Sequence, residues 1–212
     1  MILKQRNLRV AIANQWDRFG LPFLLLVLIV VFSSLSESFR TGYNLVSNFQ
    51  FAAMIGIGAI GMAFCIMSGD FDISVVSMSA LVGVLGASLV PKFGGVVGVL
   101  VTILLATGLG FLNGVFVTKL KIPAFITTLG MMYVYRSLAF IYTNNTPVYI
   151  QDPFWLFLGN GVVFGIPFAI ILMVFCFAVG IYLLRKTPFG RYVVAVGTNK
   201  TAARLSGINV DG

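Results

Sequence analysis

Long apolar runs separated by short polar segments dominate the sequence. Most of these runs approach the roughly 20 residues that a helix needs to cross the hydrocarbon core of a bilayer. Charged residues make up only 9% of the chain, and so few charges cannot cover a water-exposed surface. We therefore predict an all-α fold, a polytopic transmembrane helix bundle with about six spans, at residues 19–32, 49–67, 73–90, 94–117, 124–142 and 162–184.

The positions of Lys and Arg predict the orientation of the bundle, because cytoplasmic loops carry an excess of positive residues. With the N-terminus in the cytoplasm, all but three of the 14 Lys and Arg residues fall in cytoplasmic segments. The exceptions are Arg40 and Lys92 outside and Arg136 within a span. We expect both termini in the cytoplasm. The same asymmetry explains the net charge of +8 without a nucleic-acid partner.

The first 19 residues do not resemble a cleavable secretory signal, because Gln15, Asp17 and Arg18 separate the basic start from the apolar run and no small-residue cleavage site follows. We expect the first span to remain in the mature protein. Pro22, near the start of that span, fits the first turn of a helix better than its interior. The predicted organisation is a cytoplasmic segment at residues 1–18, a membrane domain at 19–184 and a cytoplasmic segment at 185–212.

Residue types that carry out chemistry are scarce. Histidine is absent, which removes the usual imidazole metal ligand and general base. Cys65 and Cys176 lie in separate apolar runs, a pattern typical of packing residues and not of a metal site or disulfide. The chain lacks the GxxxxGK[ST] loop that cradles ATP phosphates. We expect no catalytic residue, metal or cofactor in this chain.

Two glycine patterns lie inside the apolar runs. Gly56, Gly58 and Gly61 spell GxGxxG, but the dinucleotide motif requires a preceding strand and a later acidic residue, which this sequence does not provide. Gly110 and Gly114 spell GxxxG. Small residues let membrane helices approach closely, so both patterns favour packing faces.

The acidic motif of residues 68–74 places two carboxylates between apolar runs with almost no loop to solvate them. Charges at membrane depth are expensive and tend to be paired or functional. In one interpretation the segment is a tight cytoplasmic turn, and Asp72 caps the following helix through its backbone N–H groups. In the other the chain is broken or re-entrant there, and the acids line a polar cavity or meet a partner protein. The candidate residues are Ser68, Gly69, Asp70, Asp72 and Ser74.

Polar residues inside or near the spans are candidates for a translocation path: Asn113, Thr127, Thr128 and Arg136. The two threonines have a simpler alternative, a hydrogen bond to their own helix backbone. Arg136 lies close enough to the outer end of its span for its side chain to snorkel outward. Alternatively it faces the bundle interior and binds a buried carbonyl or a substrate hydroxyl.

Two polar connections between spans carry further signals. After the last apolar run, Thr198 or Asn199 is a good N-cap and Gly207 a good helix stop, which predicts a short cytoplasmic helix. That helix is either a contact for a partner protein or a surface connector. The long outside loop at residues 144–161 either caps the outer mouth or rests there with Phe154 and Trp155 as interfacial anchors.

Four motifs, taken in order, resemble those of the membrane permease subunits of bacterial sugar importers of the ATP-binding-cassette class. They are SGDFDISV at 68–75, LNG at 112–114, ITTLG at 126–130, and TPFGR at 187–191 with GTN at 197–199 and AARLSGI at 202–208. The resemblance is strongest to the group that moves ribose, xylose, galactose and arabinose, and GDFD with the early QWD looks closest to arabinose permeases. Members of the group are longer and continue into further spans, so the chain is expected to be a C-terminally truncated permease.

The resemblance implies a multi-pass protein of the bacterial cytoplasmic (inner) membrane that forms the path of an ATP-driven monosaccharide import system. It implies a cytoplasmic ATPase that hydrolyses ATP, a periplasmic or extracellular sugar-binding protein, and a second permease chain in a homo- or heterodimer within the lipid bilayer. The ATPase-coupling contact would fall on Gly190, Arg191, Gly197, Asn199, Ala202, Ala203, Leu205 and Gly207. Two alternatives remain: a secondary transporter or channel in which Asp70 or Asp72 carries a proton or cation, and a structural membrane anchor.

Overall fold

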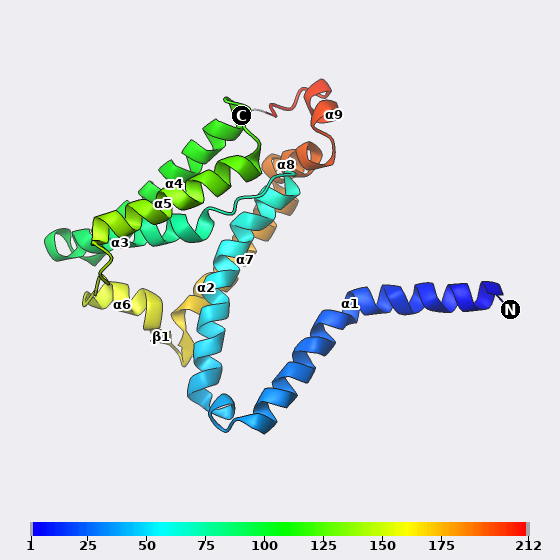
Figure 1. Ribbon diagram of the computed structural model, residues 1–212, viewed down its shortest axis with the longest axis horizontal. Coiled ribbons are helices and arrows are strands. Elements are labelled where there is room, and N and C mark those ends of the chain that lie inside the picture. Colours follow the sequence, from blue (N-terminus) through cyan, green and yellow to red (C-terminus); the bar gives the residue numbers. More distant parts are fainter. Residues whose placement is uncertain (1, 211–212) are drawn as a thin grey trace. The chain divides into compact units, whose positions relative to one another are not determined.

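The computed structural model describes residues 2–210, with side chains from residue 19 onward. The chain divides into two compact units, residues 1–49 and residues 50–212. Helices account for nearly all of the regular structure in both (Figure 1). The predicted all-α class is confirmed.

The first unit contains α1 (Ile2–Leu35), the 3-10 helix η1 (Ser38–Arg40) and the beginning of α2 (Gly42–Met67). The rings of Phe32 and Phe39 lie 5.8 Å apart and fasten η1 to the end of α1. The expectation that Pro22 opens a helix is wrong, since α1 begins 20 residues earlier and contains Pro22 in its interior. A search for long apolar runs does not detect the first part of α1, because polar and basic residues interrupt its apolar ones.

Five of the described helices are long and apolar enough to cross a membrane. The apolar part of α1, Phe19–Leu35, is shorter. The bundle of about six spans is therefore confirmed as five full-length helices and one shorter apolar stretch. The five are α2 (Gly42–Met67), α3 (Val75–Phe93), α4 (Gly95–Thr118), α5 (Ala124–Thr143) and α7 (Phe168–Lys186).

The predicted start of the last span is wrong by six residues. Residues 162–167 form a small antiparallel hairpin of β1 (Val162–Val163) and β2 (Ile166–Pro167), and α7 begins only at Phe168. The hydropathy of this stretch does not distinguish strand from helix. Pro167 marks the true boundary, because its fixed φ and missing N–H suit the residue just before or at a helix start.

Close contact between α3 and α4 depends on two glycines. A Cβ built on Gly86 would overlap Thr102 Oγ1, and it would lie 2.9 Å from the Gly98 carbonyl oxygen. Thr102 in turn donates to the Gly98 carbonyl at 2.9 Å. Because neither glycine has a side chain, the two backbones approach to a distance that larger residues would prevent. Helix α5 packs on the same helix α3, so α3, α4 and α5 lie side by side (Figure 1).

The expected glycine packing faces are only partly present. A Cβ on Gly56 would lie 2.8 Å from Met173 Sδ of α7, so this glycine supports the contact between α2 and α7. Around Gly58 and Gly61 the described part of the chain leaves open space, and the same holds for Gly110 and Gly114. Within this chain, the GxxxG of α4 is therefore not a contact face.

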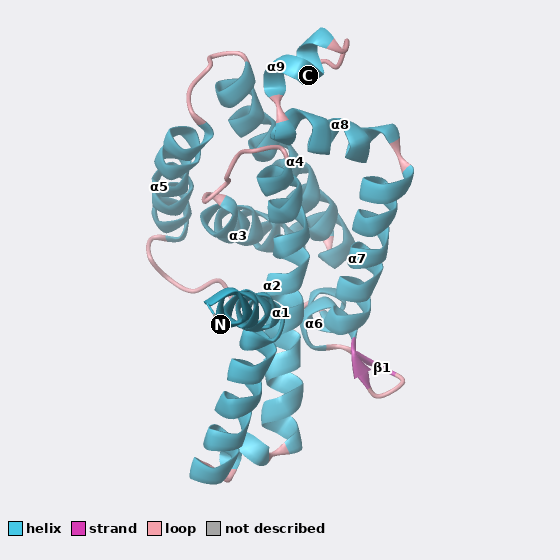
Figure 2. Ribbon diagram, turned by 90° about the vertical axis from the view of Figure 1, so that its right-hand side faces the viewer, coloured by secondary structure: helices cyan, strands magenta, loops and turns pink. Residues whose placement is uncertain are grey.

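Besides η1, the described chain has three short α-helices outside the long apolar ones, of which the sequence predicted only the last. They are α6 (Pro153–Asn160), α8 (Pro188–Thr198) and α9 (Lys200–Leu205) (Figure 2). Both unpredicted helices begin with an N-cap side chain followed by proline: Asp152 accepts from Phe154 N and Trp155 N, and Thr187 accepts from Gly190 N. Proline at the first helical position needs no hydrogen-bond partner for its nitrogen. A capping Asp or Thr followed by proline is therefore a good start for a helix.

Candidate functional site

The loop of residues 68–74 lies against the C-terminal end of α8, so the acidic motif and the predicted coupling segment meet. Gly69 has a φ of +88°, and a Cβ there would lie 3.6 Å from Gly197 Cα. A Cβ on Gly197 would overlap the Met67 carbonyl oxygen. The first glycine provides a left-handed turn and the second a close backbone approach. Together they bring two segments more than 120 residues apart into direct contact.

An ion pair adds to this contact. Lys200 Nζ lies 3.2 Å from Asp70 Oδ2 and 3.4 Å from Asp70 Oδ1. The lysine side chain is 51% exposed and the aspartate 35%. A pair this accessible contributes about 0–1 kcal/mol to stability. Its main effect is therefore to align the first residue of α9 with the acidic loop.

Asp72 has a different partner from Asp70 and binds a residue two positions along the chain. Its Oδ1 accepts hydrogen bonds from Ser74 N at 2.8 Å and Ser74 Oγ at 2.6 Å. The prediction that Asp72 caps the following helix is wrong, because the N-cap of α3 is Ser74 and Asp72 reaches only the N–H of that residue. A short Asp side chain readily binds the backbone two residues onward, and here that local turn replaces a cap.

A buried chain of hydrogen bonds continues from Ser74 into the bundle. Asn113 Nδ2 of α4 donates to Ser74 Oγ at 2.9 Å, and Tyr135 OH of α5 lies 2.9 Å from Asn113 Oδ1 and 3.2 Å from the Leu109 carbonyl oxygen. Ser74, Asn113 and Tyr135 are 0%, 4% and 1% exposed. Because polar groups removed from water must be satisfied, this chain fixes the loop relative to α4 and α5.

The two threonines of the ITTLG motif behave differently. Thr128 donates to its own helix at the Ala124 carbonyl (2.8 Å) and approaches the Phe71 carbonyl of the acidic loop at 3.3 Å. Thr128 therefore makes the predicted hydrogen bond to its own helix backbone and also contacts the acidic loop. Thr127 is equally buried, and its Oγ1 has no hydrogen-bond partner among the described residues.

Arg136 does not join these groups. Its side chain is exposed on this chain, and its guanidinium carbon lies 5.7 Å from the centroid of the Phe140 ring, one turn further along α5. A cation over an aromatic face at this distance is a favourable contact. The structure thus brings Asn113 and Thr128 toward the acidic motif and leaves Arg136 on the outside of the chain.

A cavity of about 690 Å³ opens beside the loop. Asp70 lies on its wall and Asp72 does not, so the two acids do not line this cavity together, and much of the wall is apolar. The lining combines the loop, the α4–α5 connection, α8 and α9, and includes Ser68, Asp70, Thr118, Lys121, Tyr192, Lys200 and Arg204.

Helix α9 is built as the sequence analysis predicts. Asn199 Oδ1 accepts from Ala202 N at 3.0 Å, which identifies Asn199 as the N-cap. Gly207 follows the helix with a φ of +82°, and Ile208 N donates to the Ala203 carbonyl at 3.1 Å, a left-handed helix end. Ala203 is buried, whereas Leu205 is 86% exposed.

The start of α8 returns tightly onto the end of α7. A Cβ on Gly190 would overlap the Leu184 carbonyl oxygen, and Arg191, the next residue, is exposed. Among the predicted coupling residues, Gly190 and Gly197 therefore occupy positions where only glycine fits.

Sequence reasoning missed two residues of this site. Tyr135 lies seven positions after Thr128, which places the two on one helix face. That spacing was the signal from which Tyr135 could have been predicted as part of the site. Lys200 carries no such signal, because its partner Asp70 is distant in sequence and only the folded chain brings them together.

Comparison with known proteins identifies the class of the chain. Residues 44–212 match the family model described as the permease component of the branched-chain amino acid transport system. The chain belongs to this family. Its family is one of membrane permease components, and the five described helices that are long and apolar enough to cross a membrane agree with a place in a membrane.

The resemblance to sugar permeases is also confirmed. The chain is 38% identical over 195 residues to the ribose import permease protein RbsC of Haemophilus influenzae, with 88% of this chain and 59% of the relative covered. It is 39% identical over 196 residues to the L-arabinose transport system permease protein AraH of Escherichia coli, with 92% and 60% covered. RbsC of Bacillus subtilis is 39% identical over 215 residues, with 98% and 66% covered.

The ribose and arabinose permeases thus match this chain at nearly the same sequence identity. The comparison does not support the expectation that the chain is closer to arabinose permeases than to ribose permeases. The chain spans about 60% of the length of the first two relatives. No solved structure matches the chain.

Proposed function

We propose that this chain is a transmembrane subunit of an ATP-driven monosaccharide importer, and that residues 185–212 couple it to a cytoplasmic ATPase. Support comes from the relatives, which are named as ribose and arabinose permeases. In this assignment residues 19–184 are part of the permease domain and residues 1–18 a cytoplasmic segment. A sugar-binding protein delivers the solute from the outer side.

The orientation we propose places both termini in the cytoplasm. The excess of Lys and Arg in the segments next to the acidic loop supports it, since Lys121, Lys200 and Arg204 line the cavity at that end of the helices. The opposite end carries α6 and the hairpin, and the last turn of α3 there holds a single basic residue, Lys92. The acidic loop, α8 and α9 then face the cytosol.

The observation that carries the proposal is the exposed apolar side chain on α9. Leu205 is 86% exposed on a short capped helix, while Ala203 on the same helix is buried against its own chain. A helix held on one side that exposes a leucine among polar and basic residues suits docking into a groove of a partner protein. Ala202 is exposed as well, so a small and a large apolar residue are both available to the ATPase.

We further propose that the acidic motif transmits movement of α9 to the spans. Lys200 joins α9 to Asp70, and the Asp72–Ser74–Asn113–Tyr135 chain joins the same loop to α4 and α5. A displacement of α9 by the ATPase would thus reach both helices through bonded groups. This mechanism requires the contacts to differ between two states of the permease.

The candidate path residues keep separate roles in this proposal. Asn113, Thr127 and Thr128 lie inside the chain, and the hydroxyl of Thr127, which has no partner among the described residues, would bind a sugar hydroxyl in a state of the permease that exposes it. Arg136 and Gly114 are exposed on this chain, Gly110 is half-buried with open space beside it, and this surface suits contact with a second permease chain.

The test replaces Leu205 with Glu in the permease assembled with its ATPase and binding protein. We expect loss of sugar-stimulated ATP hydrolysis and of uptake, with normal amounts of permease in the membrane. Leu120→Glu is the matched control, an exposed leucine in the α4–α5 connection near the same end of the helices. Unchanged coupling in Leu205→Glu would contradict the proposal, and uptake that persists without the ATPase but depends on pH would favour a secondary transporter.

A further inference from the structure

The hairpin between α6 and α7 presents an aromatic side chain in an unfavourable backbone conformation. Val163 pairs with Ile166, so Phe164 and Gly165 form the two-residue turn, with φ values of 51° and 80°. Two positive φ values are typical of a type I′ turn, in which Asn-Gly is preferred. A bulky residue at such a position is strained. Phe164 is nonetheless 100% exposed, so packing within this chain does not compensate for the strain.

The base of the hairpin is held rigidly on both sides. Asp152 Oδ2 accepts from Gly95 N at 3.1 Å, and Trp155 Nε1 donates to the Gly95 carbonyl at 2.7 Å, so α6 is fastened to the first residue of α4. The rings of Phe157 and Phe168 lie 5.0 Å apart, which joins α6 to α7. The position of the turn therefore follows directly from the positions of two spans, and Figure 2 shows it projecting beyond the end of α7.

The surroundings of the turn are apolar and uncharged. Between Asp152 and Arg185 the sequence contains no Asp, Glu, Lys or Arg. Val162 and Ile166, on the two strands, are 56% and 47% exposed. A soluble partner would normally be met by an interface with a polar rim. An uncharged apolar surface that runs directly into a membrane span fits lipid better, and aromatic residues are enriched where the bilayer meets water.

We propose that the hairpin of residues 162–167 is a membrane-interface anchor, which inserts Phe164 between lipid headgroups and the adjoining acyl chains. Its partner is the lipid surface. The anchor fixes the depth of α7 and, through α6, that of α4. The proposal requires that the chain spans a bilayer but does not depend on which solute the protein moves or on which side of the membrane the hairpin lies.

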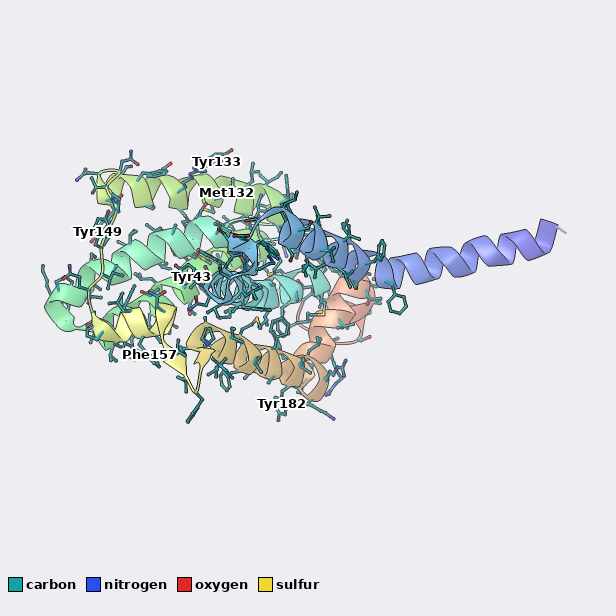
Figure 3. All side chains as sticks on the ribbon, turned by 90° about the horizontal axis from the view of Figure 1, so that it is seen from below. Tyr43, Met132, Tyr133, Tyr149, Phe157 and Tyr182 are labelled. Atoms are coloured by element: carbon teal, nitrogen blue, oxygen red, sulfur yellow. The ribbon has the colours of Figure 1, made fainter. Side chains whose placement is uncertain are left out.

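The test reads the depth of residue 164 in phosphatidylcholine–phosphatidylglycerol vesicles that contain the reconstituted chain. Phe164→Trp adds a fluorophore, and subtraction of the unsubstituted chain removes the emission of the native Trp16 and Trp155. We expect lipids brominated near the headgroup end of the acyl chain to quench the added emission, with less quenching from deep bromination. Tyr149→Trp is the control, an 85% exposed aromatic on the segment before α6 (Figure 3), which we expect aqueous iodide to quench.

Two results would overturn the anchor. Quenching of residue 164 by iodide and not by brominated lipid would place it in water, and protection from both quenchers would mean that protein covers it. A nitroxide on Phe164→Cys, with Cys65→Ala and Cys176→Ala, gives a second reading that does not require Trp in the turn. We expect this nitroxide to collide more often with oxygen, which concentrates in the bilayer, than with a nickel complex that stays in water. The reverse order would contradict the proposal.

Discussion

Lys200 Nζ lies 3.2 Å from Asp70 Oδ2, which joins the first residue of α9 to the loop between α2 and α3. Both side chains remain partly accessible to water. The pair is therefore suited to align two segments and not to hold the fold together. Salt screens such a pair, so its influence should also fall as ionic strength rises.

Removal of the ion pair should affect coupling more than stability. We expect Asp70→Asn to change the free energy of unfolding by less than about 1 kcal/mol, as for other exposed pairs, while it lowers sugar-stimulated ATP hydrolysis by the assembled transporter. The exchanged variant, Asp70→Lys with Lys200→Asp, should recover part of the lost coupling because the attraction is restored. Equal defects in the single and exchanged variants would show that the charges act separately.

The contact between the loop and α8 should tolerate no side chain at residue 197. A Cβ at Gly197 would overlap the Met67 carbonyl oxygen, so Gly197→Val is expected to separate α8 from the loop. Disulfide trapping between cysteines placed at residues 70 and 200, in a chain with Cys65→Ala and Cys176→Ala, would report the separation as a lower yield. Gly108→Val on α4 is the control, because the described chain leaves open space around Gly108. A normal yield in Gly197→Val would show that the loop accommodates the added bulk.

The buried polar chain should make a larger contribution to stability than the ion pair. Tyr135→Phe leaves Asn113 Oδ1 without its donor, and loss of a partner for a buried polar group costs about 1–3 kcal/mol. Thermal or denaturant unfolding in lipid nanodiscs measures this loss. Tyr133→Phe is the matched control, since Tyr133 is 60% exposed and lies on the outer side of α5 (Figure 3). Equal stability of the two variants would argue against the network.

Ser74 occupies the middle of the same chain, where it donates to Asp72 and accepts from Asn113. Ser74→Ala removes both bonds at once. If the chain acts as a unit, the double variant Ser74→Ala with Tyr135→Phe should lose less stability than the sum of the two single losses. Strict additivity would mean that the bonds act independently.

The fold was predictable from the sequence because its main signal, the length of uninterrupted apolar runs, is local. The short helix at residues 200–205 was predictable for the same reason, since Asn199 and Gly207 mark its ends. The hairpin at residues 162–167 was not, because its apolar residues have the same hydropathy as the span that follows. The overlooked helices α6 and α8 did carry a signal, the N-cap and proline pairs at 152–153 and 187–188.

The candidate site was predictable as a set of residues but not as an arrangement. Acids without solvating neighbours identified the loop of residues 68–74, yet the two acids have different partners. Asp70 binds a lysine 130 positions away, whereas Asp72 binds a serine two positions away. No spacing rule along one chain distinguishes these outcomes, because the first depends on where α9 lies after folding.

Asp152 should keep the connection between α5 and α7 well ordered. Its carboxylate accepts from Gly95 N as well as from Phe154 N and Trp155 N, so it serves the starts of both α4 and α6. Asp152→Ala is expected to cost about 0.5–2 kcal/mol, as for other N-caps, and to speed hydrogen exchange of the amides of residues 95, 154 and 155. Gln151→Ala, at the exposed neighbouring position, should leave these rates unchanged. Because α6 supports the hairpin, the same variant should also make residue 164 less uniform in depth, and unaltered exchange at residue 95 would show that the carboxylate does not hold α4.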